Sequence, residues 1–285
     1  MHEINKIINK ASLTKAESAI RAYILDRSAE ACFMTSTDIA LAAGVSEATV
    51  IRFTRKLGFG GFTDFQKKLR FCYQKEHNRV SENITVPHER LLKSLETGDP
   101  NYVEQYALSA QNNIMSAVKN NRREKYERAV DIIMASENKY VLGSRANVGL
   151  ASYTCFLMNC MVKGAVFANS PVGSQIDNLI DISERDCLIA FSFPRYSRMD
   201  ELAADQAHQA GAKIITITDR ASAPLAASAQ VVFTVDISSP QFFNSFVAVQ
   251  HILETLCAGI SRRVGRDSGD KLKSIDKYLD ILKIY

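Results

Sequence analysis

The first part of the chain has apolar positions that recur only at helical spacing. In "TKAESAIRAYILDRS", residues 14–28, Ile20, Tyr23 and Ile24 lie three or four residues apart, which places them on one face of a helix. Thr14 and Glu17 have the spacing of a capping box, so this helix is expected to begin there. The same pattern predicts further helices over 36–43, 46–57 and 62–75.

From about residue 120 the pattern changes to short β-branched runs that alternate with amphipathic segments. This alternation is typical of an α/β fold with a parallel sheet. Strands are predicted over 139–143, 165–169, 187–193, 213–219 and 231–235. Helices are predicted over 148–163, 173–182, 198–211 and 222–228, followed by a long apolar helix over 243–264.

Between these two parts the periodicity weakens, which predicts a joint. In "SENITVPHERLLKSLETGDP" Pro87, Gly98 and Pro100 interrupt the helical pattern. We therefore expect a helical domain, a linker with a connecting helix, an α/β domain and a helical tail, over residues 1–79, 80–120, 121–265 and 266–285.

Two C-terminal segments are candidates for association between copies of the chain. The tail places apolar side chains on one stripe at helical spacing, and the helix over 243–264 is apolar along its length. The stripe consists of Leu272, Ile275, Leu279 and Leu282. Core packing inside a single chain would explain both segments equally well.

Charge is distributed unevenly along the chain. Residues 1–80 hold 13 Lys or Arg against 8 Asp or Glu, a net charge of +5, whereas the remainder holds 22 against 23, a net charge of −1. A basic excess confined to one small domain indicates a polyanionic partner, although a solvated surface can show the same imbalance.

Composition and hydropathy exclude several classes of protein. No apolar run approaches the roughly 20 residues that a membrane-spanning helix needs, and "MHEINKIINK" lacks the apolar segment of a signal peptide. We expect a cytoplasmic protein. The 6 cysteines form no CxxC pair and have no His partner at metal-ligand spacing, so we expect no metal site, no cofactor and no disulfide.

The segment from residue 36 meets the steric demands of a helix-turn-helix unit. Ala40 is small where the two helices would touch, and Gly44 lies in the turn. The side chains expected to face inward are Val45, Val50, Phe53 and Leu57, which leaves Ser46, Glu47, Thr49, Arg52 and Lys56 on the outer face. An ordinary solvated amphipathic helix is the alternative.

Ser46 is in N-cap position, so the following helix can present its first turn to a major groove. Arg52 or Lys56 can contact guanine edges. Phosphate contacts are expected from Arg55, Lys67, Lys68 and Arg70. The sequence therefore predicts a double-stranded DNA partner, bound through Ser46, Glu47, Thr49, Arg52, Arg55, Lys56, Lys67 and Lys68.

The run "IALAAGVSEATVIRFTRKLGFGGFTDFQ" resembles the DNA-binding domain of the RpiR/MurR family of bacterial transcriptional regulators. The family pattern is A-x-x-x-G-V-S-x-A-T-V-x-R-F-x-R-x-L-G-F-x-G-F, and residues 40–62 match it from Ala40 to Phe62. The resemblance implies that the glycines end the recognition helix and turn Phe59 and Phe62 over the core. It also implies a C-terminal SIS (sugar isomerase) domain, a flavodoxin-like five-stranded parallel sheet that binds phosphorylated sugars.

Ligands of open α/β sheets bind outside the carboxyl ends of the strands, where this chain has "GSRANVG" and "SFPRYSR". The effector-binding residues we expect are Gly143, Ser144, Arg145, Asn147, Ser192, Arg195, Tyr196 and Ser197. These loops depart from the common SIS patterns G-x-G-x-S and S-x-S-G-x-[ST], because arginines stand at 145 and 195. Either the arginines grip an anion or they fill the pocket; ordinary turn chemistry is a third explanation.

The histidines do not form a catalytic arrangement in the sequence. An isomerase needs an acid and a base that converge on the sugar, whereas His208 and His251 lie inside predicted helices with no His/Glu pair at a strand end. We therefore expect no catalytic residues. The prediction is a homo-oligomeric regulator of carbohydrate metabolism, dimer or tetramer, which binds a palindromic operator under control of a small anionic, sugar-like effector. The alternatives are an architectural DNA-binding protein with a ligand-free SIS domain, and a phosphosugar isomerase.

Overall fold

The computed structural model describes residues 2–9, 11–77, 86–97, 101–169, 173–265 and 267–283. The chain forms two compact units, one of residues 1–112 with 238–245 and one of residues 113–237 with 246–285. The sequence placed residues 80–120 in a linker and connecting helix, of which 80–85 and 98–100 lie outside the described residues. Of the described part of that segment, residues 86–97 and 101–112 belong to the first unit and 113–120 to the second.

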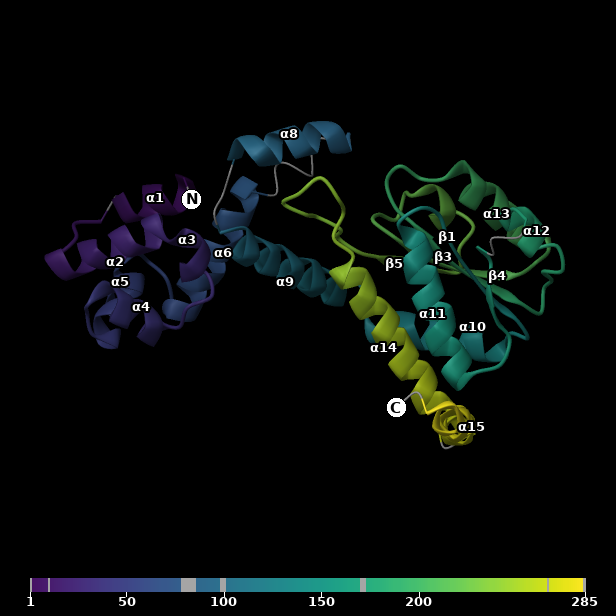
Figure 1. Cartoon of the computed structure of the whole chain (residues 1–285). Coiled ribbons are helices and arrows are strands. Elements are labelled where there is room, and N and C mark those ends of the chain that lie inside the picture. The colour runs from purple at the N-terminus through teal and green to yellow at the C-terminus, as the bar shows by residue number, and fades with distance from the viewer. Residues whose placement is uncertain are drawn as a thin grey trace. The chain divides into compact units, whose positions relative to one another are not determined.

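The first unit is helical, in agreement with the sequence pattern (Figure 1). Its helices are α1 (His2–Asn9), α2 (Lys15–Asp26), α3 (Ser28–Ala31), α4 (Ser36–Ala43), α5 (Glu47–Lys56), α6 (Phe62–His77), α8 (Pro87–Thr97) and the first part of α9 (Tyr102–Asn120). Thr14 caps α2 and Thr35 caps α4, each in a capping box. The core includes Ile20, Ile24, Ile39, Phe53 and Phe65.

Helix α8 lies within the segment that the sequence predicted as a joint. Pro87 is its first residue, a position where the missing N–H of proline costs no hydrogen bond, so this proline begins a helix and does not interrupt one. The buried Arg90 donates from Nη2 to the carbonyl oxygens of Gln241 and Phe243, at 2.8 and 2.9 Å, and from Nη1 to Asn244 Oδ1 at 3.1 Å. These bonds attach α8 to the loop 238–245 of the same unit.

The second unit is an α/β domain with a five-stranded, all-parallel sheet of order β2-β1-β3-β4-β5. The strands are β1 (Lys139–Gly143), β2 (Ala165–Phe167), β3 (Cys187–Ser192), β4 (Lys213–Thr218) and β5 (Val231–Thr234). Its other helices are α10 (Arg123–Ala135), α11 (Asn147–Met161), α12 (Gln175–Asn178), α13 (Arg198–Gln209), α14 (Val247–Val264), α15 (Asp267–Leu282) and the 3-10 helix η1 (Pro224–Ala226). The predicted fold class is confirmed.

Helices cover both faces of the sheet, so strands β1 and β3 are buried at every position (Figure 1). On β3, Ile189 and Phe191 pack in one cluster with α10, α11 and α14, whereas Leu188 and Ala190 pack in the other with α13. Helix α14 contributes Ile252, Leu256 and four further buried apolar side chains to the first cluster. Its apolar length is therefore explained by packing within the chain.

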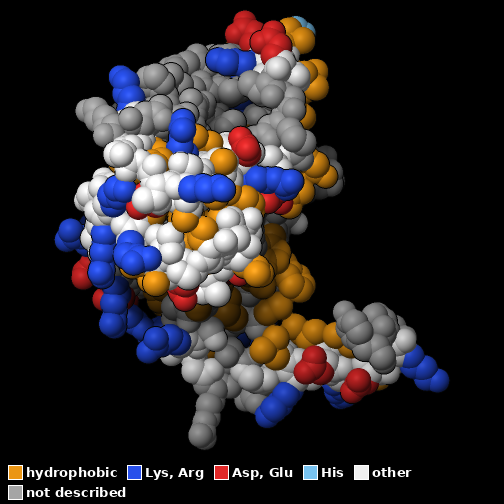
Figure 2. All heavy atoms as spheres, turned by 90° about the vertical axis from the view of Figure 1, so that its left-hand side faces the viewer, with side chains coloured by type: hydrophobic (Ala, Val, Ile, Leu, Met, Phe, Trp, Pro, Cys, Tyr) orange, Lys and Arg blue, Asp and Glu red, His pale blue; other side chains and the backbone are white. Residues whose placement is uncertain are grey.

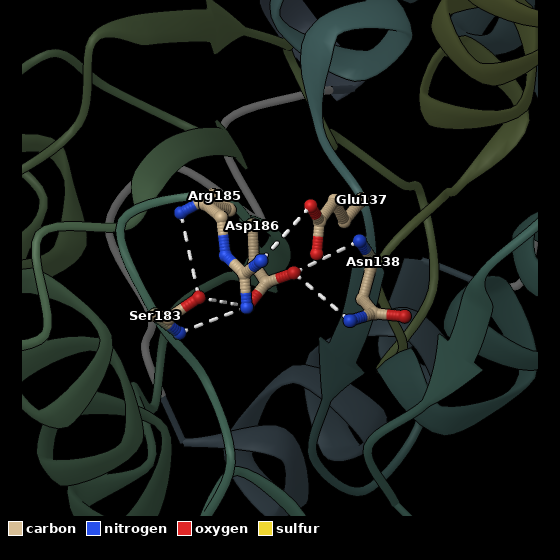
Figure 3. Close-up of polar contacts among 5 residues, drawn as sticks. All are labelled: Glu137, Asn138, Ser183, Arg185 and Asp186. Carbon is tan, nitrogen blue, oxygen red and sulfur yellow. Dashed lines mark hydrogen bonds and ion pairs between the residues drawn. The ribbon is translucent and has the colours of Figure 1, made fainter.

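A buried carboxylate joins the amino-terminal ends of β1 and β3 (Figure 3). Asp186 accepts hydrogen bonds from the backbone N and Nδ2 of Asn138, at 2.9 and 3.0 Å, and from the backbone N and Oγ of Ser183, at 2.9 and 2.8 Å. Burial alone would raise the pKa of Asp186, but these hydrogen bonds outweigh it and hold the pKa below its usual value. Beside it, Arg185 and Glu137 form an exposed ion pair. The cluster fixes the edge of the sheet opposite to the candidate ligand loops.

Two predicted helices are shorter than the pattern indicated. The segment 173–182 forms only α12, which Ser174 caps, and 222–228 forms only η1. In the first segment Ser174 and Asp177 form a capping box around a single helical turn. In the second, Pro224 begins a three-residue 3-10 helix that has no capping side chain.

Candidate nucleic-acid interface and effector site

The turn between α4 and α5 depends on Gly44. This residue ends α4 in the left-handed conformation, with φ of 65°, which glycine adopts without steric cost. The amide of Val45 then donates to the carbonyl oxygen of Ala40 at 2.9 Å, and Ala40 itself is buried. The roles predicted for Ala40 and Gly44 are therefore observed.

The inner face of α5 carries the apolar side chains that the sequence predicted. Val50 and Phe53 are fully buried, and Val45 and Leu57 pack partly buried against the same cluster. The rings of Phe59 and Phe65 meet edge to face, with centroids 5.3 Å apart. Phe62 also packs on Phe65. Apolar packing on one side holds the polar side of α5 outward.

The amino-terminal end of α5 presents a connected polar surface. Ser46 caps the helix by accepting from the amide of Thr49, and its Oγ lies 2.8 Å from Thr49 Oγ1. Arg52 Nη2 donates to Thr49 Oγ1 at 3.3 Å. Ser36 Oγ donates to Glu47 Oε1 at 2.6 Å, which joins the first turns of α4 and α5. Ser46, Glu47, Thr49 and Arg52 therefore lie together at one end of the helix.

Lys56, which the sequence placed on the same outer face, has a partner within the protein. Its Nζ donates to Glu17 Oε2 on α2 at 2.7 Å. This hydrogen bond is the largest influence on the pKa of Glu17, which lies below its usual value. Lys56 therefore connects α5 to α2.

The predicted phosphate contacts differ in how far they are engaged. Arg70 donates from Nε to the carbonyl oxygen of Cys32 at 2.6 Å, and the ammonium group of Lys68 lies 5.3 Å from the ring centroid of Phe71. The side chains of Arg55 and Lys67 are exposed and make no hydrogen bond or ion pair with any described residue. In Figure 2 exposed Lys and Arg side chains extend along one edge of the face shown. This surface is suited to a polyanion.

In the second unit the two candidate loops leave neighbouring strands. Gly143 of β1 is paired with Phe191 of β3, so Ser144 and Ser192 are the next residues of the two strands at the same edge. Helix α11 follows β1 on one face of the sheet and α13 follows β3 on the other. The loops therefore meet at a topological switch point, the place where open α/β sheets bind ligands.

Gly143 is required by close packing at this point. A Cβ there would lie 2.8 Å from the carbonyl oxygen of Asn147. Asn147 in turn donates from Nδ2 to the carbonyl oxygen of Phe191 at 3.2 Å, across to β3. The amide of Gly143 donates to Asn169 Oδ1 at 2.9 Å. Gly143 and Asn147 thus hold the two loops together.

Ser144 contacts a carboxylate that the sequence analysis did not identify. Its Oγ donates to Asp200 Oδ1 at 2.5 Å, its backbone N donates to Asp200 Oδ2 at 3.3 Å, and Gln175 Nε2 donates to its Oγ at 2.9 Å. Asp200 is only 2% exposed. Burial raises the pKa of Asp200 above its usual value, although the hydrogen bonds from Ser144 and Gln175 oppose this.

Asp200 and Gln175 are thus missing from the set of site residues that the sequence predicted. Asp200 follows the helix cap Ser197 by three residues, which is the spacing of a capping box. That signal indicates a local contact with Ser197, but the Asp200 carboxylate instead reaches Ser144. No signal in the sequence indicated Gln175.

Two polar atoms in this region have no hydrogen-bond partner among the described residues. They are Oγ of Ser192, which is 1% exposed, and Oε1 of Gln175. Buried polar atoms without partners are rare in folded proteins, and a bound ligand is one way to satisfy them.

Arg145 and Arg195 both have left-handed backbones, with φ of 57° and 31°. These are the positions at which the SIS patterns have glycine, the residue that adopts this conformation most readily. The backbone shape of a glycine loop is therefore kept while a guanidinium group is added. Both side chains are exposed, which favours a role in gripping an anion over filling a pocket.

Tyr196, from the same set of predicted residues, is engaged within the protein. Its hydroxyl donates to Asp219 Oδ1 at 2.7 Å, and the guanidinium of Arg220 lies 5.5 Å from its ring centroid. Burial, followed by the hydrogen bond to Asp219, raises the pKa of Tyr196. Tyr196 therefore ties the β3 loop to the end of β4.

A pocket of about 580 Å³ lies elsewhere in the second unit. It is lined by Ile114, Leu150, Phe246, Val247, Gln250, His251 and Glu254. No His/Glu pair was predicted at a strand end, and His251 and Glu254 of α14 instead lie on the lining of this one pocket. The ring of Phe246 packs on Phe193, with centroids 5.4 Å apart.

The described residues contain neither a membrane-spanning helix nor a metal site. No helix in that part of the chain is long and apolar enough to cross a membrane. Nor do three or more His, Cys, Asp or Glu side chains of those residues converge as a metal site would require.

Comparison with known proteins agrees with both units. The family model described as helix-turn-helix domain, rpiR family, matches residues 1–76, and that of the SIS domain matches residues 132–258. An uncharacterized HTH-type transcriptional regulator of Caldanaerobacter subterraneus subsp. tengcongensis is 22% identical over 96% of this chain and 95% of its own. Another, from Clostridium perfringens, is 28% identical over 82% of this chain and 85% of its own.

Among solved structures, the Vibrio vulnificus NanR protein complexed with ManNAc-6P is similar in fold, with a TM-score of 0.55 and 20% identity. The match covers 95% of this chain and 94% of NanR. The two family models thus match one after the other along the chain, in the order of the predicted domains. The chain belongs to the RpiR family of helix-turn-helix transcriptional regulators that carry a C-terminal SIS domain.

Proposed function

We propose that this regulator controls genes of carbohydrate metabolism by binding a palindromic operator in the cytoplasm, and that a small anionic effector, a phosphorylated sugar, modulates the binding. The observation that carries the proposal is the pairing of the β1 and β3 loops at the switch point, with Ser144, Ser192 and two exposed arginines on one edge of the sheet. NanR, of similar fold, binds a phosphorylated sugar.

On the DNA side, α5 enters the major groove with its amino-terminal end. Arg52 is placed to read a base, since it lies beside Thr49 at that end and is exposed. Arg55 and Lys67 hold phosphates, because both are exposed cations with no partner among the described residues. A homo-oligomer, dimer or tetramer, would present two such helices to the two half-sites.

Helix α15 supports association between copies of the chain. It exposes Leu272, Ile275, Tyr278 and Ile281, while Leu279 is half-buried and the side chain of Leu282 lies outside the described residues. Exposed apolar side chains along a helix are typical of an interface. Sedimentation analysis at several concentrations tests this; a monomer throughout contradicts it.

The contact between Phe193 and Phe246 offers a route from effector to operator. Phe193 follows Ser192 in the β3 loop, and Phe246 is the first residue of the second unit after the loop 238–245. A ligand that shifts Phe193 would act where the chain passes between its units. Phe246→Leu is expected to reduce the effect of the ligand on operator affinity at least threefold, whereas Phe156→Leu, exposed on α11, is the control.

The direct experiment begins with operator fragments selected from genomic DNA by the purified protein. Fluorescence anisotropy then measures their affinity in the presence of phosphorylated sugars, their unphosphorylated parents and sugar acids. One phosphorylated sugar is expected to change the apparent affinity at least tenfold. If no sugar alters DNA binding or thermal stability, the architectural alternative replaces this proposal; a bound ligand at 100 times its Kd should add about 2.7 kcal/mol to stability.

An isomerase activity is the second candidate, because His251 and Glu254 line one pocket and general acid–base chemistry uses such side chains. We place it second, since two relatives that are matched over most of both chains are named transcriptional regulators. Turnover of a phosphosugar without DNA, abolished in His251→Gln, would favour the enzyme.

A further inference from the structure

We propose that Asp200 is an internal competitor of the anionic effector, because its carboxylate occupies the hydrogen-bond donors of Ser144 that an incoming phosphate would use. The inference rests on the proposed function in that the effector is taken to be an anion bound at the ends of β1 and β3. It adds a residue that controls the affinity of that site for anions, and it explains what occupies the donors of Ser144 when no effector is bound.

The hydrogen-bond donors at the carboxyl end of β1 belong to Ser144. The first residue after β1 offers a backbone N–H and a hydroxyl, the two kinds of donor that anion sites at strand ends use. In the structure both donors of Ser144 point to one carboxylate, with N to Oδ2 at 3.3 Å and Oγ to Oδ1 at 2.5 Å. A carboxylate with this two-donor contact resembles a bound anion, and here the protein supplies it.

Asp200 is held firmly in place. It lies in the first turn of α13, where Ser197 accepts a hydrogen bond from its backbone N, and it is 2% exposed. Gln175 Nε2 donates to Ser144 Oγ at 2.9 Å and so orients the hydroxyl toward Asp200. An anion cannot take these donors while the carboxylate stays, because two negative charges would share one small buried space.

Other donors in the two loops remain for the ligand. Ser192 Oγ is buried without a hydrogen-bond partner among the described residues. Ser192 follows Phe191, the β3 residue that pairs with Gly143, just as Ser144 follows Gly143. Arg145 and Arg195 extend from the same two loops. An anion that displaces Asp200 would find two serine hydroxyls and two guanidinium groups. An anion that does not displace it must bind without Ser144.

The test uses orthophosphate as the probe and the full chain without DNA, with binding followed by phosphorus NMR titration. Asp200→Asn keeps the shape of the side chain and removes its charge, and is expected to lower the Kd for orthophosphate at least tenfold. Asp205→Asn is the matched control, since Asp205 is exposed on the same helix, and should stay within twofold of the wild type. Adding Ser144→Ala to Asp200→Asn should remove most of the gain.

Equal affinity in the wild type and Asp200→Asn overturns the inference, and so does a gain that survives the loss of the Ser144 hydroxyl in full. If Asp200→Asn does not fold, Asp200→Ser, which is smaller and also neutral, decides on the same criterion. The proposed function fails separately. A gain in phosphate affinity in Asp200→Asn, with no effect of sugars on operator binding, supports the inference and contradicts the proposed function. Equal phosphate affinities of wild type and Asp200→Asn, with a clear effect of a sugar on operator binding, contradict the inference and support the proposed function.

Discussion

Lys56 and Glu17 form an ion pair of 2.7 Å that joins the carboxyl end of α5 to the first turn of α2. The glutamate side chain is 11% exposed and the lysine 38%, so the pair is partly screened by water. Glu17 also accepts a hydrogen bond from the backbone N of Thr14 at 2.8 Å, which completes the capping box of α2. The contact therefore supports the position of α5 on the helices behind it.

Lys56→Ala is expected to affect stability more than sequence discrimination. The pair is partly exposed, so its loss should lower the free energy of unfolding by roughly 0.5–1 kcal/mol, as measured by urea denaturation. The preference for operator over random DNA should change less than threefold. A tenfold loss of discrimination with unchanged stability would instead make Lys56 a base-reading residue.

Arg52→Ala is expected to have the opposite profile. Arg52 is exposed beside Thr49 and Ser46 at the end of α5 that is placed to enter the groove. Its loss should weaken operator binding by about 1–3 kcal/mol and relax specificity at one position, while the unfolding free energy stays close to that of the wild type. Anisotropy with operator variants measures this. Unchanged operator affinity would remove α5 from its role as the recognition helix.

Lys67→Ala should weaken binding to operator and random DNA alike. Lys67 is an exposed cation without a partner among the described residues, so each phosphate contact it makes releases counterions. The slope of log K against log salt should fall by about one. Lys213→Ala, exposed on the sheet unit, serves as the control and should leave the slope unchanged. Equal slopes for wild type and Lys67→Ala would exclude the phosphate contact.

Much of the fold was predictable because its determinants are local in sequence. Gly44 and Ser46 mark a turn and a helix start within three residues, and β1 is a short apolar run whose predicted bounds, 139–143, are the observed ones. The contacts that define the candidate site are not local. Ser144 and Asp200 are 56 residues apart, and Lys56 and Glu17 are 39 apart. A pattern read along the chain gives each side chain a face, but only the packed structure gives it a partner.

The acid sensitivity of the fold should depend on Asp186. Its pKa is lowered in the folded state by hydrogen bonds from Ser183 and Asn138, so the unfolded chain binds the proton more tightly. The stability that it contributes is therefore present above the unfolded pKa, about 3.9, and is lost as pH falls through the lower folded value. Asp186→Asn carries no negative charge, and its side-chain nitrogen cannot accept a hydrogen bond, so the variant cannot keep all four bonds. It should therefore be less stable than the wild type at pH 7. The difference from wild type should shrink toward pH 3 in thermal unfolding, whereas Asp205→Asn should show no such convergence. A difference that is constant with pH would mean that Asp186 does not titrate differently in the folded and unfolded states.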